Sequence, residues 1–260
     1  MNQTPQQHKS SILDQFSRQA IPFSSVPGHW DAMQILIEMS GVRETDQVLD
    51  VACGPGIVAC AFARHARHVT GIDITPAMIE QARKRGQDEM ISNVDWQTGE
   101  AVPLPFDNDT FSLVVTRYSF HHFLAPDSAL REMIRVCRPG GTVLVADVAI
   151  DPAKSAGYDE MEIMRDPSHV HALTTVEFDA LFSDADLNDC RRSSYGVEIE
   201  LEAQLAASFP NPDDKPVLRS MVVEDIGRDR LGINARREDG NVVYTVPISV
   251  YSGRKKPASA

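Results

Sequence analysis

The sequence predicts an α/β fold in which a doubly wound, mostly parallel sheet of seven strands carries helices on both faces. Two observations lead to this prediction. Between residues 47 and 148, short apolar runs alternate with segments of helical apolar spacing, and this alternation is typical of parallel strands joined by helices. The first apolar run, QVLDVA, also turns through the stretch CGPG directly into the next apolar segment.

Each predicted strand of this region is followed by a short turn or by a helix. Apolar runs predict strands at 47–52, 68–73, 94–99, 111–118 and 141–148, and helical spacing predicts helices at 57–66, 76–86 and 125–137. Pro76 and Gly86 are the residue types that begin and end helices. These elements therefore predict five parallel strands.

The segments outside this region follow a different rhythm. Helical spacing before it predicts helices at 11–19 and 30–40, and after residue 150 it predicts helices at 156–166 and 175–185. Strands are expected at 191–202 and 241–253. Because these two late strands are far apart in the sequence, we expect them to pair antiparallel at the sheet edge.

Composition limits the class of protein. The chain has 260 residues and a net charge of −12 at pH 7, which opposes a general nucleic-acid binder with its basic face. The first twenty residues are polar, and no apolar run approaches a membrane span. We therefore expect a soluble, cytoplasmic protein with no membrane partner. The four cysteines lack metal spacing and the Asp and His residues are dispersed, so no metal site is predicted.

The glycine turn after the first strand predicts a ligand site. In open parallel sheets, ligands bind beyond the carboxyl ends of the strands. Gly54 and Gly56 let the backbone approach a ligand closely, and the N–H groups of the following helix favour an anionic group. A tight turn without any ligand is the alternative interpretation.

A carboxylate at the end of the second strand favours a nucleoside. Asp73 lies 17 residues after Gly56, where it can accept both hydroxyls of a ribose, although Asp is also a common helix cap. A dinucleotide is the rival ligand, because GPGIVA fits the GxGxxG/A pattern with Ala59 last. Asp50 inside the first strand has no role near a pyrophosphate, which speaks against that rival.

Five segments in order resemble the class I S-adenosylmethionine-dependent methyltransferases: VLDVACGPG, GIDITPAMIEQAR, GEAVPLPFDNDTFSLV, TRYSFHHF and LREMIRVCRPGGTVLVADV. They are most similar to the branch that includes the ubiquinone and menaquinone biosynthesis enzymes. Two further pieces, QFSRQAIPF and MRDPSHV, resemble a bacterial subgroup of mostly unassigned methyltransferases. The resemblance implies a Rossmann-like methyltransferase sheet and methyl transfer from S-adenosylmethionine to a small molecule.

The same resemblance implies how the chain is organised: an N-terminal helical lid at 1–40, a cofactor-binding core at 41–150 and acceptor-side helices with the last two strands at 151–260. Two other classes of function stay open. One is a nicotinamide- or flavin-dependent oxidoreductase, and the other is a protein that binds the cofactor without catalysis. A nucleic-acid methyltransferase is opposed by the charge and by the lack of an NPPY-like motif. The oligomeric state is not predicted.

The resemblance implies the residues around the cofactor's methionine and ribose. Backbone N–H groups of Gly54 and Gly56 would hold the methionine end, and Asp50 would lie near the ammonium group. Asp73 would accept the ribose hydroxyls, and Ile74 would pack on the adenine ring.

It also implies contacts at the two ends of the cofactor. Glu100 would meet the adenine amino group and the Ala101 N–H a ring nitrogen, although the family more often has Asp at position 100. The Thr116 carbonyl would lie near the ammonium group, with Arg117 close behind.

Two aromatic residues precede the core. Phe16 and Phe23 flank a helix break, and the resemblance implies that this region is a lid, with phenylalanine at position 23 where a tyrosine is expected. An aromatic face is attractive to a sulfonium cation. Both rings could equally cap the hydrophobic core.

Few residues are candidates for a general base. His121 and His122 follow the fourth predicted strand, and imidazole titrates near neutral pH; we favour His121, with packing as the alternative for either. His169 is the second candidate, with a cap or salt bridge as its alternative. Arg117 and Arg165 could bind an acceptor carboxylate or pair with local acids.

Overall fold

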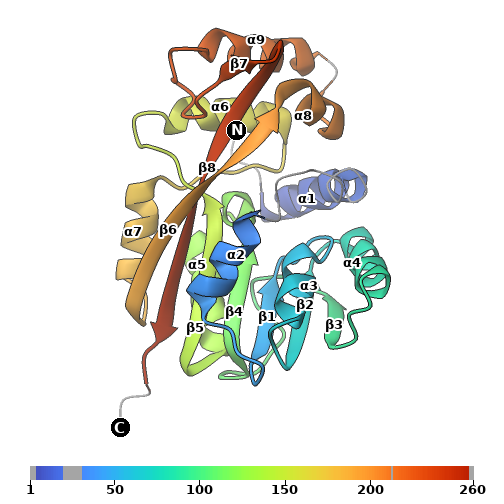
Figure 1. Cartoon of the computed structure of the whole chain (residues 1–260), viewed down its shortest axis with the longest axis vertical. Helices are drawn as coiled ribbons and strands as arrows, with labels where there is room; N and C mark the ends of the chain where they lie inside the picture. The colour runs from blue at the N-terminus through green and yellow to red at the C-terminus, as the bar shows by residue number, and fades with distance from the viewer. Residues whose placement is uncertain (1–3, 20–30, 212, 258–260) are drawn as a thin grey trace.

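The structure, a computed structural model, describes residues 4–19, 31–211 and 213–257 (Figure 1). Its centre is a sheet whose first five strands are parallel, in the order β3-β2-β1-β4-β5. Their bounds are β1 (Gln47–Val51), β2 (His68–Asp73), β3 (Val94–Thr98), β4 (Phe111–Arg117) and β5 (Cys137–Val148). The parallel, doubly wound sheet predicted from the alternation is confirmed.

The two late strands extend this sheet antiparallel, as predicted. The strand β8 (Asn241–Lys255) pairs with β5 on one side and with β6 (Leu187–Glu200) on the other. An eighth strand, β7 (Arg236–Glu238), forms a hairpin with β8, so the predicted count of seven strands is one too few. The turn between them is Asp239-Gly240, with φ of +47° and +87°, which is the conformation a two-residue hairpin requires.

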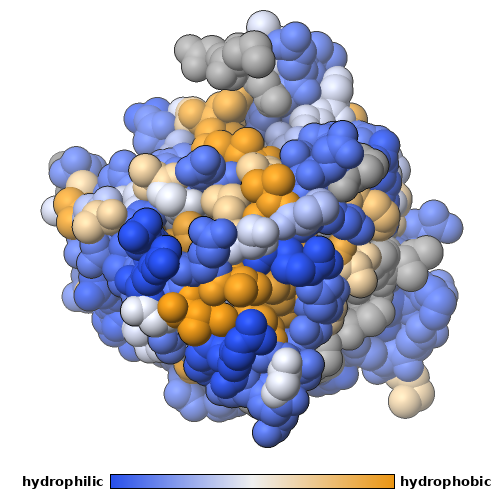
Figure 2. All heavy atoms as spheres, turned by 90° about the horizontal axis from the view of Figure 1, so that it is seen from above, coloured by the Kyte–Doolittle hydropathy of each residue, from blue (hydrophilic) through white to orange (hydrophobic). Residues whose placement is uncertain are grey.

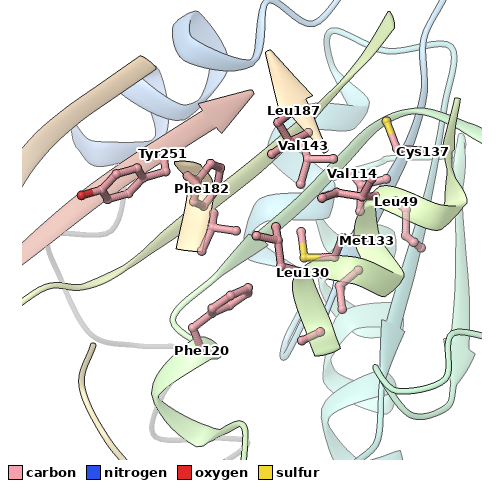
Figure 3. Close-up of a cluster of buried hydrophobic side chains, with 14 of the residues drawn as sticks. Leu49, Val114, Phe120, Leu130, Met133, Cys137, Val143, Phe182, Leu187 and Tyr251 are labelled. Carbon is pink, nitrogen blue, oxygen red and sulfur yellow. The ribbon is translucent and has the colours of Figure 1, made fainter. Parts of the chain in front are cut away.

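Helices cover both faces of the sheet. The helices α2 (Asp31–Ser40), α3 (Ile57–Ala63) and α4 (Pro76–Asp88) lie on one face, whereas α5 (Pro126–Val136) and α7 (Thr175–Ser183) lie on the other. On the second face, Leu130 and Met133 of α5 and Phe182 of α7 pack against Val114 and Val143 of the strands (Figure 3). A separate core forms on the first face.

A third group of elements lies beyond the end of the sheet, at the top of Figure 1. It contains α6 (Ser155–Arg165), α8 (Leu201–Ala207), α9 (Asp214–Asp225), β7 and the adjoining ends of β6 and β8, and it has its own apolar core. Figure 2 looks onto this end and shows hydrophobic residues in separate groups between hydrophilic ones. We call this group the upper layer.

The first helix, α1 (Pro5–Gln19), lies between the upper layer and the sheet (Figure 1). Its His8 ring donates a hydrogen bond to the His122 carbonyl, with 2.7 Å between Nε2 and oxygen, and its Ser11 hydroxyl donates to the Pro167 carbonyl. The helix therefore covers the ends of the strands, where ligands of open sheets bind. Within the described segments, no helix has the length and apolar character needed to cross a membrane.

Candidate functional site

Two cavities lie beneath α1, at the carboxyl ends of β1, β2 and β4. The first, which we call the methionine-side cavity, is lined by residues that include Asp50, Gly54, Asp73 and Arg117. The second, the adenine-side cavity, is lined by residues that include Ile74, Gly99, Glu100 and Ala101. Asp73, Ile74 and Ala52 line both, so the two cavities adjoin at these residues. Eight predicted cofactor residues thus line one of them, namely Phe16, Asp50, Gly54, Asp73, Ile74, Glu100, Ala101 and Arg117.

Asp50 presents an unpaired carboxylate oxygen to the methionine-side cavity. It lies within β1, is 1% exposed, and its Oδ2 has no hydrogen-bond partner among the described residues. Burial raises the pKa of this carboxyl to about 8, although Arg117 acts in the opposite direction. A buried acid of this kind is costly unless a cation approaches it, so the site is suited to an ammonium group.

Asp73 holds the glycine turn in place. Its Oδ2 accepts the Gly54 N–H at 2.9 Å and its Oδ1 accepts the Thr75 N–H at 2.8 Å. Burial raises its pKa, and these two hydrogen bonds act against that shift. Each oxygen keeps lone-pair capacity for a further donor. The carboxylate therefore links the turn to the cavity, where two hydroxyl donors can reach it.

Gly56 has a packing role that the sequence did not reveal. Its N–H donates to the Cys53 carbonyl and its φ is +80°. A Cβ at this position would lie 2.6 Å from the Trp96 ring and 3.0 Å from the Ala82 Cβ. In the described part of the chain, Gly56 lines neither the methionine-side nor the adenine-side cavity. The second glycine of the turn thus makes room for Trp96.

The adenine-side cavity is bounded by an ion pair between the lid and the core. Lys9 of α1 contacts Glu100, with 2.5 Å between Nζ and Oε1. Both side chains are partly exposed, so the pair itself is worth little. It does, however, occupy the carboxylate that was predicted to meet the adenine amino group.

The end of β4 places Tyr118 beside Arg117 at the methionine-side cavity. Both residues line this cavity, and the Arg117 guanidinium lies 4.6 Å from the centre of the Tyr118 ring. Tyr118 has a φ of +59°, which is strained for an aromatic residue. Strained backbone conformations of this kind cluster at functional sites. Thr116 is fully buried, its hydroxyl donates to the Val51 carbonyl, and within the described chain it lines neither of the two cavities.

Phe16 projects from α1 onto the site. Its ring meets the His122 ring edge-on, with 5.0 Å between the ring centres, and it lines the methionine-side cavity. The predicted aromatic wall is therefore present at this position. Phe23 lies outside the described residues.

A third cavity, which we call the acceptor cavity, lies between the sheet and the upper layer. Its space is about 950 Å³, a figure that includes the open solvent at its mouth. Much of its wall is apolar and comes from β5, β6 and β8: Val148, Val197, Ile199, Val246 and Ile248. Charged side chains from β5, from α6 and from the residue after α6 complete it: Asp147, Glu162, Arg165 and Asp166.

His121 lines this acceptor cavity and is held by a carboxylate. The distance between its Nδ1 and the Asp147 Oδ1 is 2.6 Å. Burial alone would lower the pKa of His121, but the adjacent Asp147 charge outweighs burial and the net shift is upward. Asp147 is 1% exposed and also accepts the Phe120 and Val148 N–H groups, so the pair is fixed.

His122 has the opposite electrostatic environment. Burial and the neighbouring His121 lower its pKa to about 3. Its Nδ1 lies 3.0 Å from the Ser168 carbonyl oxygen, and because a carbonyl only accepts, this nitrogen carries the proton. The ring lines all three cavities. His122 is therefore neutral where the cavities meet.

His169 is not placed as the second candidate base requires. Its Nε2 is bound to Asp159 Oδ1 at 2.8 Å, and its side chain is 1% exposed. Within the described residues it lines none of the three cavities. A local acid, Asp159, binds the ring instead. The ring packs behind His121, 5.5 Å between centres.

Arg165 pairs with a local acid, which is the alternative that the sequence left open. Its guanidinium makes two hydrogen bonds to Glu162, at 2.8 and 2.6 Å. Glu162 and then Asp166 raise the pKa of Arg165 against the effect of burial. The guanidinium borders the acceptor cavity as one half of an ion pair.

Sequence reasoning missed three residues of the site: Tyr118, Asp147 and Glu162. Asp147 could have been noticed, because it is a carboxylate inside the apolar run of β5, as Asp50 is inside β1. Glu162 and Tyr118 carry no such signal, because their local contacts with Arg165 and Arg117 do not show that they line a cavity.

Comparisons with known proteins agree with this geometry. A family model described as a methyltransferase domain matches residues 48–141. The sequence is 30% identical over 201 residues to the ubiquinone/menaquinone biosynthesis C-methyltransferase UbiE of Pseudomonas putida, covering 75% of this chain and 70% of that protein. The chain belongs to the class I S-adenosylmethionine-dependent methyltransferases.

Another methyltransferase relative has a solved structure. The uncharacterized methyltransferase YcgJ of Bacillus subtilis is 34% identical over 151 residues, which is 57% of this chain and 60% of YcgJ. Its crystal structure superposes with a TM-score of 0.80 at 25% identity, covering 88% of this chain and 100% of that one. The sequence match thus spans about three-fifths of this relative's length.

The residues present fit the cofactor of this methyltransferase family. The unpaired Asp50 oxygen suits the cofactor's ammonium group, and the Asp73 carboxylate suits two ribose hydroxyls. The two adjoining cavities under α1 can hold the two ends of the cofactor, the methionine end in one and the adenine end in the other. S-adenosylmethionine is the cofactor of the family to which the chain belongs.

Proposed function

We propose that this protein transfers a methyl group from S-adenosylmethionine to a small molecule bound in the acceptor cavity. The cofactor supplies an electrophilic methyl group on a sulfonium, which carries the chemical driving force. The protein's part is to align the acceptor with that methyl group and to exclude water.

One observation carries this proposal: the acceptor cavity and the methionine-side cavity share a wall. Phe16, Tyr118 and His122 line both of them. A small molecule in one cavity and a cofactor in the other would therefore meet at these three side chains. An in-line displacement requires such an arrangement, since the nucleophile attacks the methyl carbon from the side opposite to the departing sulfur.

The residue roles predicted from the sequence enter this proposal with the changes that the geometry requires. Asp50, Asp73 and Ile74 are proposed to bind the ammonium, ribose and adenine groups, with Glu100 and Ala101 at the adenine end. Gly54 is proposed to act through its bond to Asp73. The helix α1 is proposed as the lid, the core 41–150 as the cofactor-binding part and 151–260 as the acceptor side.

The relatives favour methyl transfer over the oxidoreductase alternative, because UbiE and YcgJ are both named as methyltransferases. The name of the Pseudomonas putida relative places that protein in quinone biosynthesis. The apolar walls of the acceptor cavity support a small organic acceptor here as well.

Calorimetric titration tests the cofactor. We expect S-adenosylmethionine and S-adenosylhomocysteine to bind with micromolar affinity, and NAD(H) not to bind. Asp73→Ala should weaken binding by about 10- to 100-fold, because hydrogen bonds to a charged group contribute about 1.5–3 kcal/mol. Asp95→Ala, at an exposed carboxylate on β3, is the matched control and should bind as the wild type does. Binding of NAD(H) instead would overturn the proposal.

A further inference from the structure

We propose that His121, positioned by Asp147, accepts a proton from the methyl acceptor, and that the acceptor is therefore a phenol or an enol. This inference rests on the proposed methyl transfer and adds the chemical class of the acceptor. It gives different roles to two adjacent histidines, of which the sequence favours His121 as the base.

The first step concerns the tautomer of His121. A carboxylate only accepts hydrogen bonds, so the 2.6 Å contact with Asp147 requires that Nδ1 carries the hydrogen. In the neutral ring, Nε2 then has a free lone pair. That nitrogen has no hydrogen-bond partner among the described residues, and the ring lines the acceptor cavity. His121 thus presents a proton acceptor to a bound molecule.

The second step concerns Asp147, which acts through His121. Its Oδ2 accepts the Phe120 N–H at 2.6 Å and its Oδ1 accepts the Val148 N–H at 2.7 Å. Burial raises the pKa of Asp147, but the His121 charge and these hydrogen bonds lower it by more than burial raises it. The net shift is downward, so Asp147 is ionised. A fixed carboxylate behind an imidazole both orients the ring and stabilises its protonated form. Asp147 is a positioning residue.

The third step concerns the other charges around His121. Asp147 of β5 and Glu162 of α6 favour its protonated form, and Arg165 of α6 opposes it. The rings of His122 and His169 lie 4.1 and 5.5 Å from it, centre to centre. The net effect is an upward shift of the His121 pKa, which makes it a stronger proton acceptor than an ordinary histidine.

The fourth step removes His122 from this role. Its proton lies on Nδ1, bound to the Ser168 carbonyl, and its pKa of about 3 keeps Nε2 unprotonated at ordinary pH. Two neighbouring titratable groups whose environments separate their pKa values in this way divide acid–base work between them. Nε2 of His122 can only accept a hydrogen bond, whereas Nε2 of His121 can take the proton.

The class of acceptor follows from the walls and the base together. The apolar strands β6 and β8 suit a hydrophobic body, and a proton acceptor is useful only if the reacting group has a proton to lose. In the reaction through oxygen, the acceptor's hydroxyl proton moves to His121 Nε2, and an electron pair of the hydroxyl oxygen forms a bond to the methyl carbon. The carbon–sulfur bond breaks, and its electron pair stays on sulfur. Attack through the conjugated carbon also balances: the O–H electron pair becomes the second bond of a carbonyl group, and the electron pair of the carbon–carbon double bond forms the bond to the methyl carbon.

The test uses para-nitrophenol, whose ionised form absorbs visible light, added to the full-length protein with S-adenosylhomocysteine bound. We expect the wild type to bind the probe and lower its apparent pKa by about one unit or more, because His121 takes the proton. His121→Gln and Asp147→Asn should lose most of this shift. His65→Gln, at an exposed histidine of the loop after α3, is the matched control and should keep it.

An independent readout follows the histidine itself. In an NMR titration of the ring, His121 should titrate above the ordinary range in the wild type and at lower pH in Asp147→Asn. A wild type that does not bind para-nitrophenol, or an equal shift in His121→Gln, would overturn the inference. The same samples report S-adenosylhomocysteine affinity, so failure of the proposed function appears separately as loss of that binding in the wild type.

Discussion

Asp50 shows how a single buried carboxyl can link stability to cofactor binding. Burial raises its pKa from 3.8 to about 8, so the folded state holds the proton more tightly than the unfolded state does. The free energy of unfolding therefore falls as pH rises between about 4 and 8, by up to about 1.4 kcal/mol per pH unit. A residue that reduces stability in this way is retained where it has a ligand to bind.

Asp50→Asn should separate these two effects. The amide has nearly the same shape and no charge, so the stability advantage of the variant over the wild type should grow by about 3–4 kcal/mol between pH 5 and pH 8. It should also bind S-adenosylmethionine about 10- to 100-fold more weakly. Urea unfolding at both pH values and calorimetry provide the measurements. An equal stability difference at both pH values would contradict the assignment.

Some residues of the site can be predicted from the sequence, and others cannot. The sequence places Asp73 and His121 at the cavities because each lies at or just after the carboxyl end of a strand, although it does not separate a ligand role for Asp73 from a capping role. His169 looks similar in the sequence, but Asp159 binds it away from the acceptor cavity. A one-dimensional sequence shows that a titratable group is near the site, and it does not show which partner orients it.

At the scale of elements, a substitution can test why the turn between β1 and α3 needs glycine at position 56. Gly56→Ala should destabilise the protein by about 1–3 kcal/mol, because its Cβ would overlap the Trp96 ring and its φ of +80° is strained for alanine. Adding Trp96→Leu should recover part of that loss. Denaturant midpoints measure both.

A ligand-contact role for Gly56 predicts the opposite outcome. Gly56→Ala would then weaken S-adenosylhomocysteine binding without changing stability, and Trp96→Leu would restore nothing.

The helix α1 is expected to control cofactor retention more than folding. It is joined to the rest of the described chain through His8, Lys9, Ser11 and Phe16 at the site. Phe16→Ala removes the ring that lines two cavities, so we expect faster release of S-adenosylhomocysteine, by about tenfold, with little loss of stability. Stopped-flow displacement measures the release rate. Ser17→Ala, on the exposed side of the same helix, is the control, and an equal loss of stability and retention would argue against a lid.

The long strands of the sheet could be predicted from the sequence, whereas the short hairpin strand could not. The parallel strands were recovered because strand and helix periods differ, and the late antiparallel pair followed from its separation in the sequence. The hairpin of β7 was missed because three residues, Arg236–Glu238, are too short to show alternation. Its turn, Asp239-Gly240, was the available signal.

At the scale of the whole molecule, one strand joins three apolar cores. Tyr251 of β8 belongs to the core beside α5 and α7, Val250 to the core beside α2 and α3, and Ile248 to the core of the upper layer. Alternate side chains of a strand point to opposite faces, and β8 is long enough to continue past the sheet. The cofactor side and the acceptor side are thus built on the same strand.

This shared strand predicts a single cooperative unfolding transition for the whole chain. S-adenosylhomocysteine at 100 times its dissociation constant should add about 2.7 kcal/mol, which for a chain of this size raises the midpoint by about 5–10 °C. Differential scanning calorimetry should therefore show one peak that moves as a unit. Two peaks, of which the ligand moves only one, would mean that the upper layer unfolds separately from the sheet, and that acceptor binding can be lost while the cofactor site stays folded.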